Sequence, residues 1–177
     1  MKNQALALDG QTKSASVFEW PVRVYWEDTD AGGIVFYANY LKFFERARTE
    51  WLRHLGLGQQ ALRETTGGMF VVTDAQLKYH RAARLDDMMC VTAGVQAAGR
   101  ASVLLHQQAW LLAPPASPGT ITPSAPGTAD TVSASTQRAL LCEASVRIGW
   151  VDASQLRPQR MPALVFQAIF RSNTHDQ

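Results

Sequence analysis

Hydrophobic and polar residues alternate along residues 17–26, VFEWPVRVYW, and aromatic and β-branched side chains are frequent there. This pattern predicts a first β-strand. Three later apolar segments are also predicted as strands: residues 69–80, 88–97 and 101–113. A last strand is predicted for residues 138–151, and a short helix is expected to begin near Pro162.

A long amphipathic helix is predicted for residues 39–55. Its apolar residues recur at spacings of three and four, which places them on one broad buried face: Tyr40, Phe43, Phe44, Ala47, Trp51 and Leu55. Four charged residues are expected largely off that face: Lys42, Glu45, Arg48 and Arg53. A helix with so many aromatic residues is best buried against a sheet, and two glycines, Gly56 and Gly58, are expected to end it.

The length of 177 residues fits one domain with a full hydrophobic core. We expect a flexible N-terminal tail at residues 1–16, a single domain at residues 17–170 and a C-terminal tail at residues 171–177. Residues 114–135 hold five of the eight prolines and few large apolar residues, so they cannot contribute to a packed core. We interpret them as a flexible insert between two neighbouring strands, and a functional lid is the alternative.

Composition and charge narrow the class of protein. Hydrophobic residues make up 46% of the chain and charged residues 18%, which is typical of a globular protein. The net charge of +2 gives no electrostatic indication of a nucleic-acid binder. The sequence shows neither a secretory signal nor a run long enough to span a bilayer. We predict a cytoplasmic protein.

The two cysteines, Cys90 and Cys142, fall in different predicted strands. We interpret them as reduced core thiols, with a disulfide as the alternative. No Cys/His cluster has the spacing of a zinc site, so no metal is expected.

The turn before the long helix, residues 27–33, EDTDAGG, carries the most informative chemistry. Unpaired N–H groups at a helix N-terminus carry a partial positive charge and can hold a carbonyl oxygen as it becomes an oxyanion. An aspartate with the ordinary pKa of about 3.9 is ionised at neutral pH, so Asp30 could attack the carbonyl or activate water. A thioester suits this arrangement because a thiol of pKa about 8.5 leaves readily as thiolate.

One other interpretation of the turn remains, and one is excluded. Asp28 and Asp30 are also typical of residues that only shape a turn and cap a helix. A calcium loop would place Asp28, Asp30 and Gly33 at its first, third and sixth positions, but it fails because Gly32 takes the fifth place and Asn39 the twelfth.

Residues 27–53, EDTDAGGIVFYANYLKFFERARTEWLR, resemble the signature of bacterial hotdog thioesterases of the 4-hydroxybenzoyl-CoA thioesterase type, and within them the acyl-CoA thioesterase branch associated with the Tol-Pal system. The likeness extends to WPVRVYW, YHRAARLDDMM and CEASVRIGWVD. It implies an α+β hotdog fold, in which an antiparallel sheet wraps around the long helix. It also implies a dimer or tetramer with active sites at the subunit interface, and hydrolysis of an acyl-CoA without a cofactor.

The resemblance also assigns roles to individual residues. Asp30 matches the catalytic aspartate of the family, and Gly33 matches a glycine that lets the chain pass close to the thioester. The backbone N–H of Tyr37, together with that of Ala38, is expected to polarise the thioester carbonyl. Tol-Pal-associated members often have histidine in place of Tyr37 and tyrosine in place of Trp26. Both of these differences fall at the expected active site.

Arginines are the candidates for contact with the phosphates of CoA. Arg84 and Arg100 lie in predicted turns where a guanidinium could meet a phosphate, and solvated turn charges are the alternative. Arg46 and Arg48 are expected to form ion pairs on the long helix with Glu45 or Glu50.

Two rival functions follow from the same sequence. A hotdog dehydratase or hydratase normally uses a histidine near the helix entrance, and none of the four lies there: His54, His80, His106 and His175. The other rival is a non-catalytic acyl-thioester binder or scaffold that docks acyl carrier protein or envelope-associated partners. Replacing Asp30 by asparagine would leave that function intact.

Overall fold

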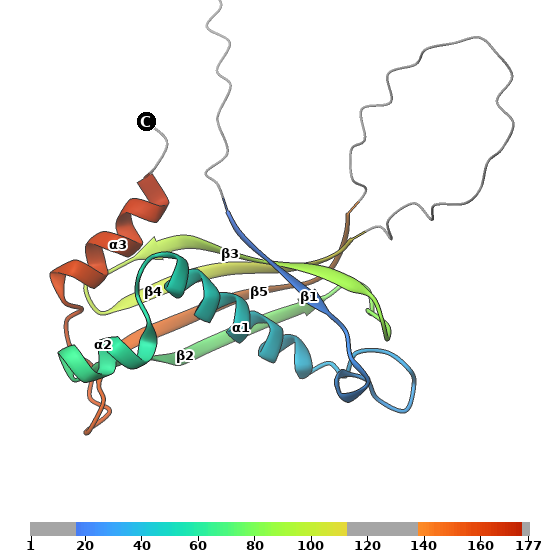
Figure 1. Ribbon diagram of the computed structural model, residues 1–177, viewed down its shortest axis with the longest axis horizontal. Coiled ribbons are helices and arrows are strands. Elements are labelled where there is room, and N and C mark those ends of the chain that lie inside the picture. The colour runs from blue at the N-terminus through green and yellow to red at the C-terminus, as the bar shows by residue number, and fades with distance from the viewer. Residues whose placement is uncertain (1–16, 113–137, 175–177) are drawn as a thin grey trace, which may run out of the picture.

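The computed structural model describes residues 17–112 and 138–174, which form one antiparallel sheet and three α-helices (Figure 1). The elements in chain order are β1 (Phe18–Arg23), the 3-10 helix η1 (Trp26–Asp28), α1 (Asn39–His54), α2 (Gln59–Thr66), β2 (Gly68–Tyr79), β3 (Met88–Ala98), β4 (Ser102–Leu111), β5 (Ala139–Asp152) and α3 (Ala163–Thr174). The five strands lie in the order β1-β3-β4-β5-β2, and each neighbouring pair is antiparallel.

The predicted fold class and the order of the main elements are confirmed: a strand, a long helix, then a run of antiparallel strands. Strands β4 and β5 pair up to Leu111 and Ala139, so the two ends of the connecting segment are neighbours. The predicted insert 114–135, the tail 1–16, residues 175–177 and His175 lie outside the described residues. Residues 171–174 continue α3.

Two details of the prediction are wrong. Residues 24–26 were expected to continue the first strand, but β1 ends at Arg23. The chain turns there because Asp28 Oδ2 accepts the N–H of Tyr25 at 2.9 Å, which starts η1. Helix α2 was not predicted, because its eight residues, QQALRETT, are mostly polar and bury only Leu62.

The hydrophobic core lies between α1 and the sheet. The predicted apolar face of α1 is buried, with Phe43 and Phe44 fully enclosed. The sheet contributes buried aliphatic and aromatic side chains that include Val91, Val103, Leu105, Leu141, Val146 and Trp150. Each such side chain contributes about 1.5–3 kcal/mol on burial, so this contact fixes α1 and the loop that leads into it.

A buried polar bridge crosses this core. Arg48 was expected off the apolar face, but it is only 5% exposed. Its Nη1 donates to Gln107 Oε1 of β4 at 2.7 Å, and its Nη2 donates to Glu45 Oε2 at 2.6 Å. Gln107 in turn donates to the carbonyl oxygens of Phe44 at 3.1 Å and Thr92 at 3.3 Å. Arg48 can be buried because Gln107 and Glu45 accept hydrogen bonds from its guanidinium group.

The predicted ion pairs on α1 are confirmed in part. Arg48 pairs with Glu45. Among the described residues, Glu50 pairs with Arg53 and not with Arg46.

The prediction of reduced core thiols is confirmed, because Cys90 and Cys142 are both free and buried. Burial raises the pKa of Cys90 to about 11, with a further contribution from the nearby Glu19 carboxylate. Burial likewise raises the pKa of Cys142 to about 12, with Glu143 adding to the effect.

These thiols are expected to react slowly in the folded protein. An ordinary thiol of pKa about 8.5 is partly ionised at pH 8, but only about one in a thousand Cys90 side chains would be thiolate there. Native protein mixed with an aromatic disulfide reagent at pH 8 should therefore react far more slowly than protein in denaturant, where both thiols should titrate. Rapid, stoichiometric reaction of the native protein would contradict this expectation.

Candidate active site

Asp28 organises the segment between β1 and α1. It is buried, with 2% of its surface exposed, and its Oδ2 accepts the N–H of Tyr25. Its carbonyl oxygen accepts the backbone N–H of Phe36 at 2.9 Å and the side-chain amide of Asn39 at 2.9 Å. Asn39 is the buried first residue of α1. Asp28 and Asn39 together tie η1, the loop and the helix start into one rigid unit.

Asp30 lies two residues further on and is exposed. Its N–H donates to the carbonyl oxygen of Ile34 at 2.9 Å, and its own carbonyl oxygen accepts the N–H of Gly33 at 2.9 Å. Asp30 Oδ1 accepts the N–H of Gly32 at 2.8 Å, so the loop also fixes the carboxylate. Gly33 has a φ of 71°, a left-handed conformation that favours glycine and closes this turn.

The two aspartates therefore have different surroundings. Asp28 has the turn-shaping role that its sequence context allows. Asp30 also shapes the turn through Oδ1, but its carboxylate is exposed at the tip of the loop. Of the two, only Asp30 is open to a ligand.

The N-terminus of α1 offers hydrogen-bond donors. Ala38 is the N-cap residue, no side chain caps the helix, and its first turn contains no acidic residue. Within residues 17–112 and 138–174, the backbone N–H groups of Tyr37 and Ala38 have no hydrogen-bond acceptor. Such groups carry the partial positive charge of a helix N-terminus. They can bind an anionic oxygen.

Aromatic side chains surround this helix start and remain exposed. Trp26 on η1 is 79% exposed and Tyr37 is 63% exposed, while Tyr79 at the end of β2 is about half exposed. The rings of Tyr37 and Tyr79 meet edge to face at 6.4 Å, and the hydroxyl of Tyr79 donates to the carbonyl oxygen of Tyr37 at 3.1 Å. An exposed apolar surface around polar groups marks a place for a ligand or another subunit.

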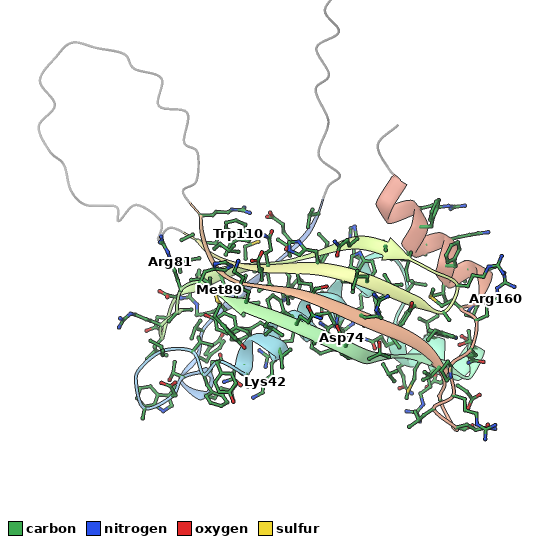
Figure 2. The ribbon with its side chains drawn as sticks, turned by 180° about the vertical axis from the view of Figure 1, so that it is seen from behind. Lys42, Asp74, Arg81, Met89, Trp110 and Arg160 are labelled. Atoms are coloured by element: carbon green, nitrogen blue, oxygen red, sulfur yellow. The ribbon has the colours of Figure 1, made fainter. Side chains whose placement is uncertain are left out.

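The structure separates the two arginines proposed for CoA. Arg84 forms an isolated β-bridge with Ile34, which places it beside the Asp30 loop. Arg100 follows the opposite end of β3, roughly 36 Å along the strand. It lines a hollow of about 310 Å³ together with Arg160. Figure 2 shows Arg160 at the end of the molecule away from Arg81.

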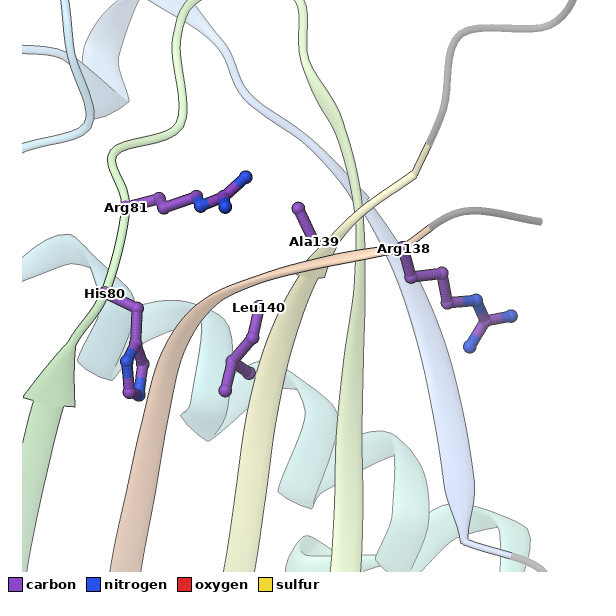
Figure 3. Close-up of a pocket in the computed structure, with 5 residues that line it drawn as sticks. All are labelled: His80, Arg81, Arg138, Ala139 and Leu140. Carbon is purple, nitrogen blue, oxygen red and sulfur yellow. The ribbon is translucent and has the colours of Figure 1, made fainter. Parts of the chain in front are cut away.

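A second hollow, of about 630 Å³, lies beside the end of β2 and is lined by His80, Arg81, Arg138, Ala139 and Leu140 (Figure 3). The side chain of Arg81 reaches across it towards Ala139. Within the described ranges Arg81 has no ion pair.

Two other basic groups at this hollow already have carboxylate partners. Arg138 makes two hydrogen bonds to Glu19, at 2.6 and 3.2 Å, and lowers the pKa of that carboxyl. His80 Nε2 lies 2.9 Å from Glu143 Oε1, and this hydrogen bond lowers the pKa of Glu143. The sequence gives Arg81 no predicted role, because only the fold shows that it lines this hollow.

The described residues group no three His, Cys, Asp or Glu side chains in a way that could hold a metal ion. None of the helices in the described ranges combines the length and hydropathy needed to cross a membrane.

Comparison with known sequences gives consistent results. Residues 32–113 match the model of the thioesterase superfamily. The chain is 35% identical over 149 residues to the acyl-CoA thioester hydrolase YbgC of Escherichia coli O6:H1, covering 84% of this chain and 92% of that protein. It is 50% identical over 91 residues to the acyl-CoA thioesterase YbgC of Haemophilus influenzae, covering 51% of this chain and 67% of that protein.

Solved structures share the fold. A probable thioesterase from Bartonella henselae superposes with a TM-score of 0.65 at 24% identity, covering 83% of this chain and all of that one. A 4-hydroxybenzoyl-CoA thioesterase in complex with 4-hydroxybenzoyl-CoA superposes with a TM-score of 0.69 at 16% identity, covering 86% of this chain and 98% of that one.

Proposed function

The chain belongs to the hotdog-fold acyl-CoA thioesterases of the thioesterase superfamily and is a hydrolase of acyl-CoA thioesters, and on this premise we propose that Asp30 carries the hydrolysis. The observation that supports this most is the hydrogen-bonded loop that joins an exposed Asp30 to the uncapped start of α1. It brings a carboxylate and free N–H donors into one short segment.

In the proposed reaction, the N–H groups of Tyr37 and Ala38 hold the thioester carbonyl oxygen. Asp30 either attacks the carbonyl carbon or takes a proton from an attacking water. The C–S bond then breaks, and its electron pair leaves with the sulfur as CoA thiolate. Attack by Asp30 gives a mixed anhydride that water hydrolyses, whereas attack by water gives the carboxylic acid directly.

The remaining residues of the loop would hold the substrate. Gly33 lets the backbone turn without a side chain between the loop and the thioester. The exposed rings of Trp26 and Tyr37 offer apolar surface to the acyl or pantetheine group. Arg84, beside Ile34, is the candidate for a CoA phosphate from the same subunit, and Arg100 could reach such a phosphate only from a partner subunit.

We further propose that the active enzyme is a homo-oligomer. Strand β2 forms one edge of the sheet over 12 residues and leaves a row of backbone groups unpaired within the described sheet. Exposed apolar side chains lie beside this edge and the helix start, among them Leu41, Val72 and Tyr79. A second copy that covers them would bury the exposed surface and enclose the site.

A pair of matched substitutions tests this assembly. Leu41→Glu places a charge on an exposed apolar residue of α1, and we expect at least about tenfold weaker self-association together with lower turnover. Leu164→Glu places the same charge on an exposed leucine of α3, which lies far from the Asp30 loop, near the other end of α1 (Figure 1). This variant should leave self-association and turnover unchanged. Light scattering after size exclusion measures the assembly. A wild-type protein that is monomeric and fully active would overturn the proposal.

Thiol release from acyl-CoAs of graded chain length and from benzoyl-CoA types tests the function. Acyl carrier protein bearing an acyl chain belongs in the same panel, because its arm presents the same thioester. Turnover identifies the acyl class. Binding without turnover of any substrate would favour the scaffold function instead. The Tol-Pal association and the cytoplasmic location stay predictions.

A further inference from the structure

We propose that Tyr79 is a positioning residue for the N–H donors at the start of α1. This inference rests on the proposed function, because it concerns the groups that would hold the thioester carbonyl. Tyr79 ends β2 and lies 42 residues from Tyr37 in the sequence, yet its hydroxyl donates to the Tyr37 carbonyl oxygen at 3.1 Å. The edge of the sheet thereby holds the helix start.

The contact acts on the Ala38 donor through a single peptide group. The carbonyl of Tyr37 and the N–H of Ala38 belong to the same planar unit, and the described chain has no cis peptide. In a trans peptide the two bonds point in opposite directions, so a fixed carbonyl also fixes the direction of the N–H. Donation to the carbonyl oxygen also polarises the peptide, which strengthens the N–H as a donor by about 10–30%.

The Tyr37 carbonyl accepts a different kind of hydrogen bond from the carbonyls of the residues on either side. The carbonyl oxygen of Phe36 accepts the N–H of Asn39 at 2.8 Å, and that of Ala38 accepts the N–H of Leu41 at 3.1 Å. Both bonds are local and form with the helix itself. The Tyr37 carbonyl, by contrast, is held by a side chain from the sheet.

Contacts with two other aromatic rings hold the ring of Tyr79 in place. It meets the rings of Tyr37 at 6.4 Å and Tyr40 at 5.8 Å, both edge to face. Partial burial raises the pKa of Tyr79 above its ordinary value, which already lies well above neutral pH, so the hydroxyl remains a protonated donor. Since the ring contacts hold the side chain, removing the hydroxyl alone would leave the aromatic packing in place.

Tyr79→Phe makes that change. We expect kcat for acyl-CoA hydrolysis to fall about tenfold with KM within about twofold, a smaller loss than the hundredfold or more for deletion of a whole donor. Tyr40→Phe is the structural control. It removes the hydroxyl of Tyr40, whose ring packs against that of Tyr79, and this hydroxyl accepts the N–H of Ala83 at 3.1 Å. It should lower Tm more than Tyr79→Phe does and lower kcat less.

The carbonyl stretch of a bound thioester gives the decisive measurement. An acyl-CoA labelled with ¹³C at the thioester carbonyl is bound to Asp30→Asn, with and without Tyr79→Phe, and its infrared band is compared. Weaker donation should move the band to higher wavenumber in the double variant.

An unchanged band would overturn the inference, whatever happens to kcat, because the effect would then arise elsewhere. An unchanged kcat in Tyr79→Phe would overturn it as well. Wild-type turnover by Asp30→Asn would instead overturn the proposed function, so the two failures are distinguishable.

Discussion

Replacing Asp30 by asparagine is expected to lower kcat for acyl-CoA hydrolysis by at least about a hundredfold, with the Kd for acyl-CoA within about threefold of wild type. The amide has nearly the shape of the carboxylate, and its oxygen can still accept the N–H of Gly32 that Asp30 Oδ1 accepts now. The loop should therefore keep its conformation. Only the negative charge that attacks the carbonyl or activates water is lost.

A control at Asp86 separates this effect from a general loss of negative charge. Asp86 is also exposed in a loop, and its φ of 68° is one that asparagine readily adopts. Asp86→Asn should keep wild-type kcat. If Asp30→Asn hydrolyses acyl-CoA at a rate within threefold of wild type, the catalytic role of Asp30 is wrong.

Replacing Gln107 by leucine is expected to lower the free energy of unfolding by about 2–4 kcal/mol, the largest stability effect that we predict. The substitution leaves Arg48 Nη1 without the acceptor that now lies 2.7 Å away in the buried interface between α1 and β4. Glu45 alone cannot compensate, because it is about half exposed and meets the other guanidinium nitrogen. Urea unfolding followed by far-UV circular dichroism measures the change.

A double-mutant cycle shows whether the loss comes from this bridge. Arg48→Met removes the charge and keeps an apolar side chain of similar length, so Arg48→Met/Gln107→Leu should be more stable than Gln107→Leu alone. A loss in the double variant equal to the sum of the losses in the two single variants would contradict the proposed coupling. So would a loss below about 0.5 kcal/mol in Gln107→Leu, which is the size expected of an ordinary surface change.

The sequence predicts the framework because its local signals agree with the fold. The aromatic stripe of residues 39–55 repeats every three or four positions, and burial against the sheet confirms it. Arg48 interrupts that regularity, since its burial depends on Gln107, which lies 59 residues away. Helix α2 is held mainly by Leu62 and its connections to neighbouring elements, so its own sequence carries little signal.

Some features of the candidate site can be predicted from local sequence, whereas others depend on contacts that only the fold shows. The segment EDTDAGG before a helix allows Asp30 and the helix start to be proposed from sequence, because every participant is local. The different burial of Asp28 and Asp30 depends on the contact with Asn39, which only the folded loop shows. Tyr79 reaches the site only because β2 ends beside the helix start, and no local pattern predicts that contact.

A crystal structure of Asp30→Asn with an intact acyl-CoA would show whether Asp30 and the start of α1 act together on the thioester. If they do, the thioester carbonyl oxygen should lie about 2.7–3.1 Å from the backbone nitrogen of Tyr37 or Ala38. The side chain of residue 30 should lie about 3–3.5 Å from the carbonyl carbon or from a water in line with it. A thioester bound elsewhere, out of reach of both the helix start and residue 30, would contradict the proposed catalytic role of Asp30.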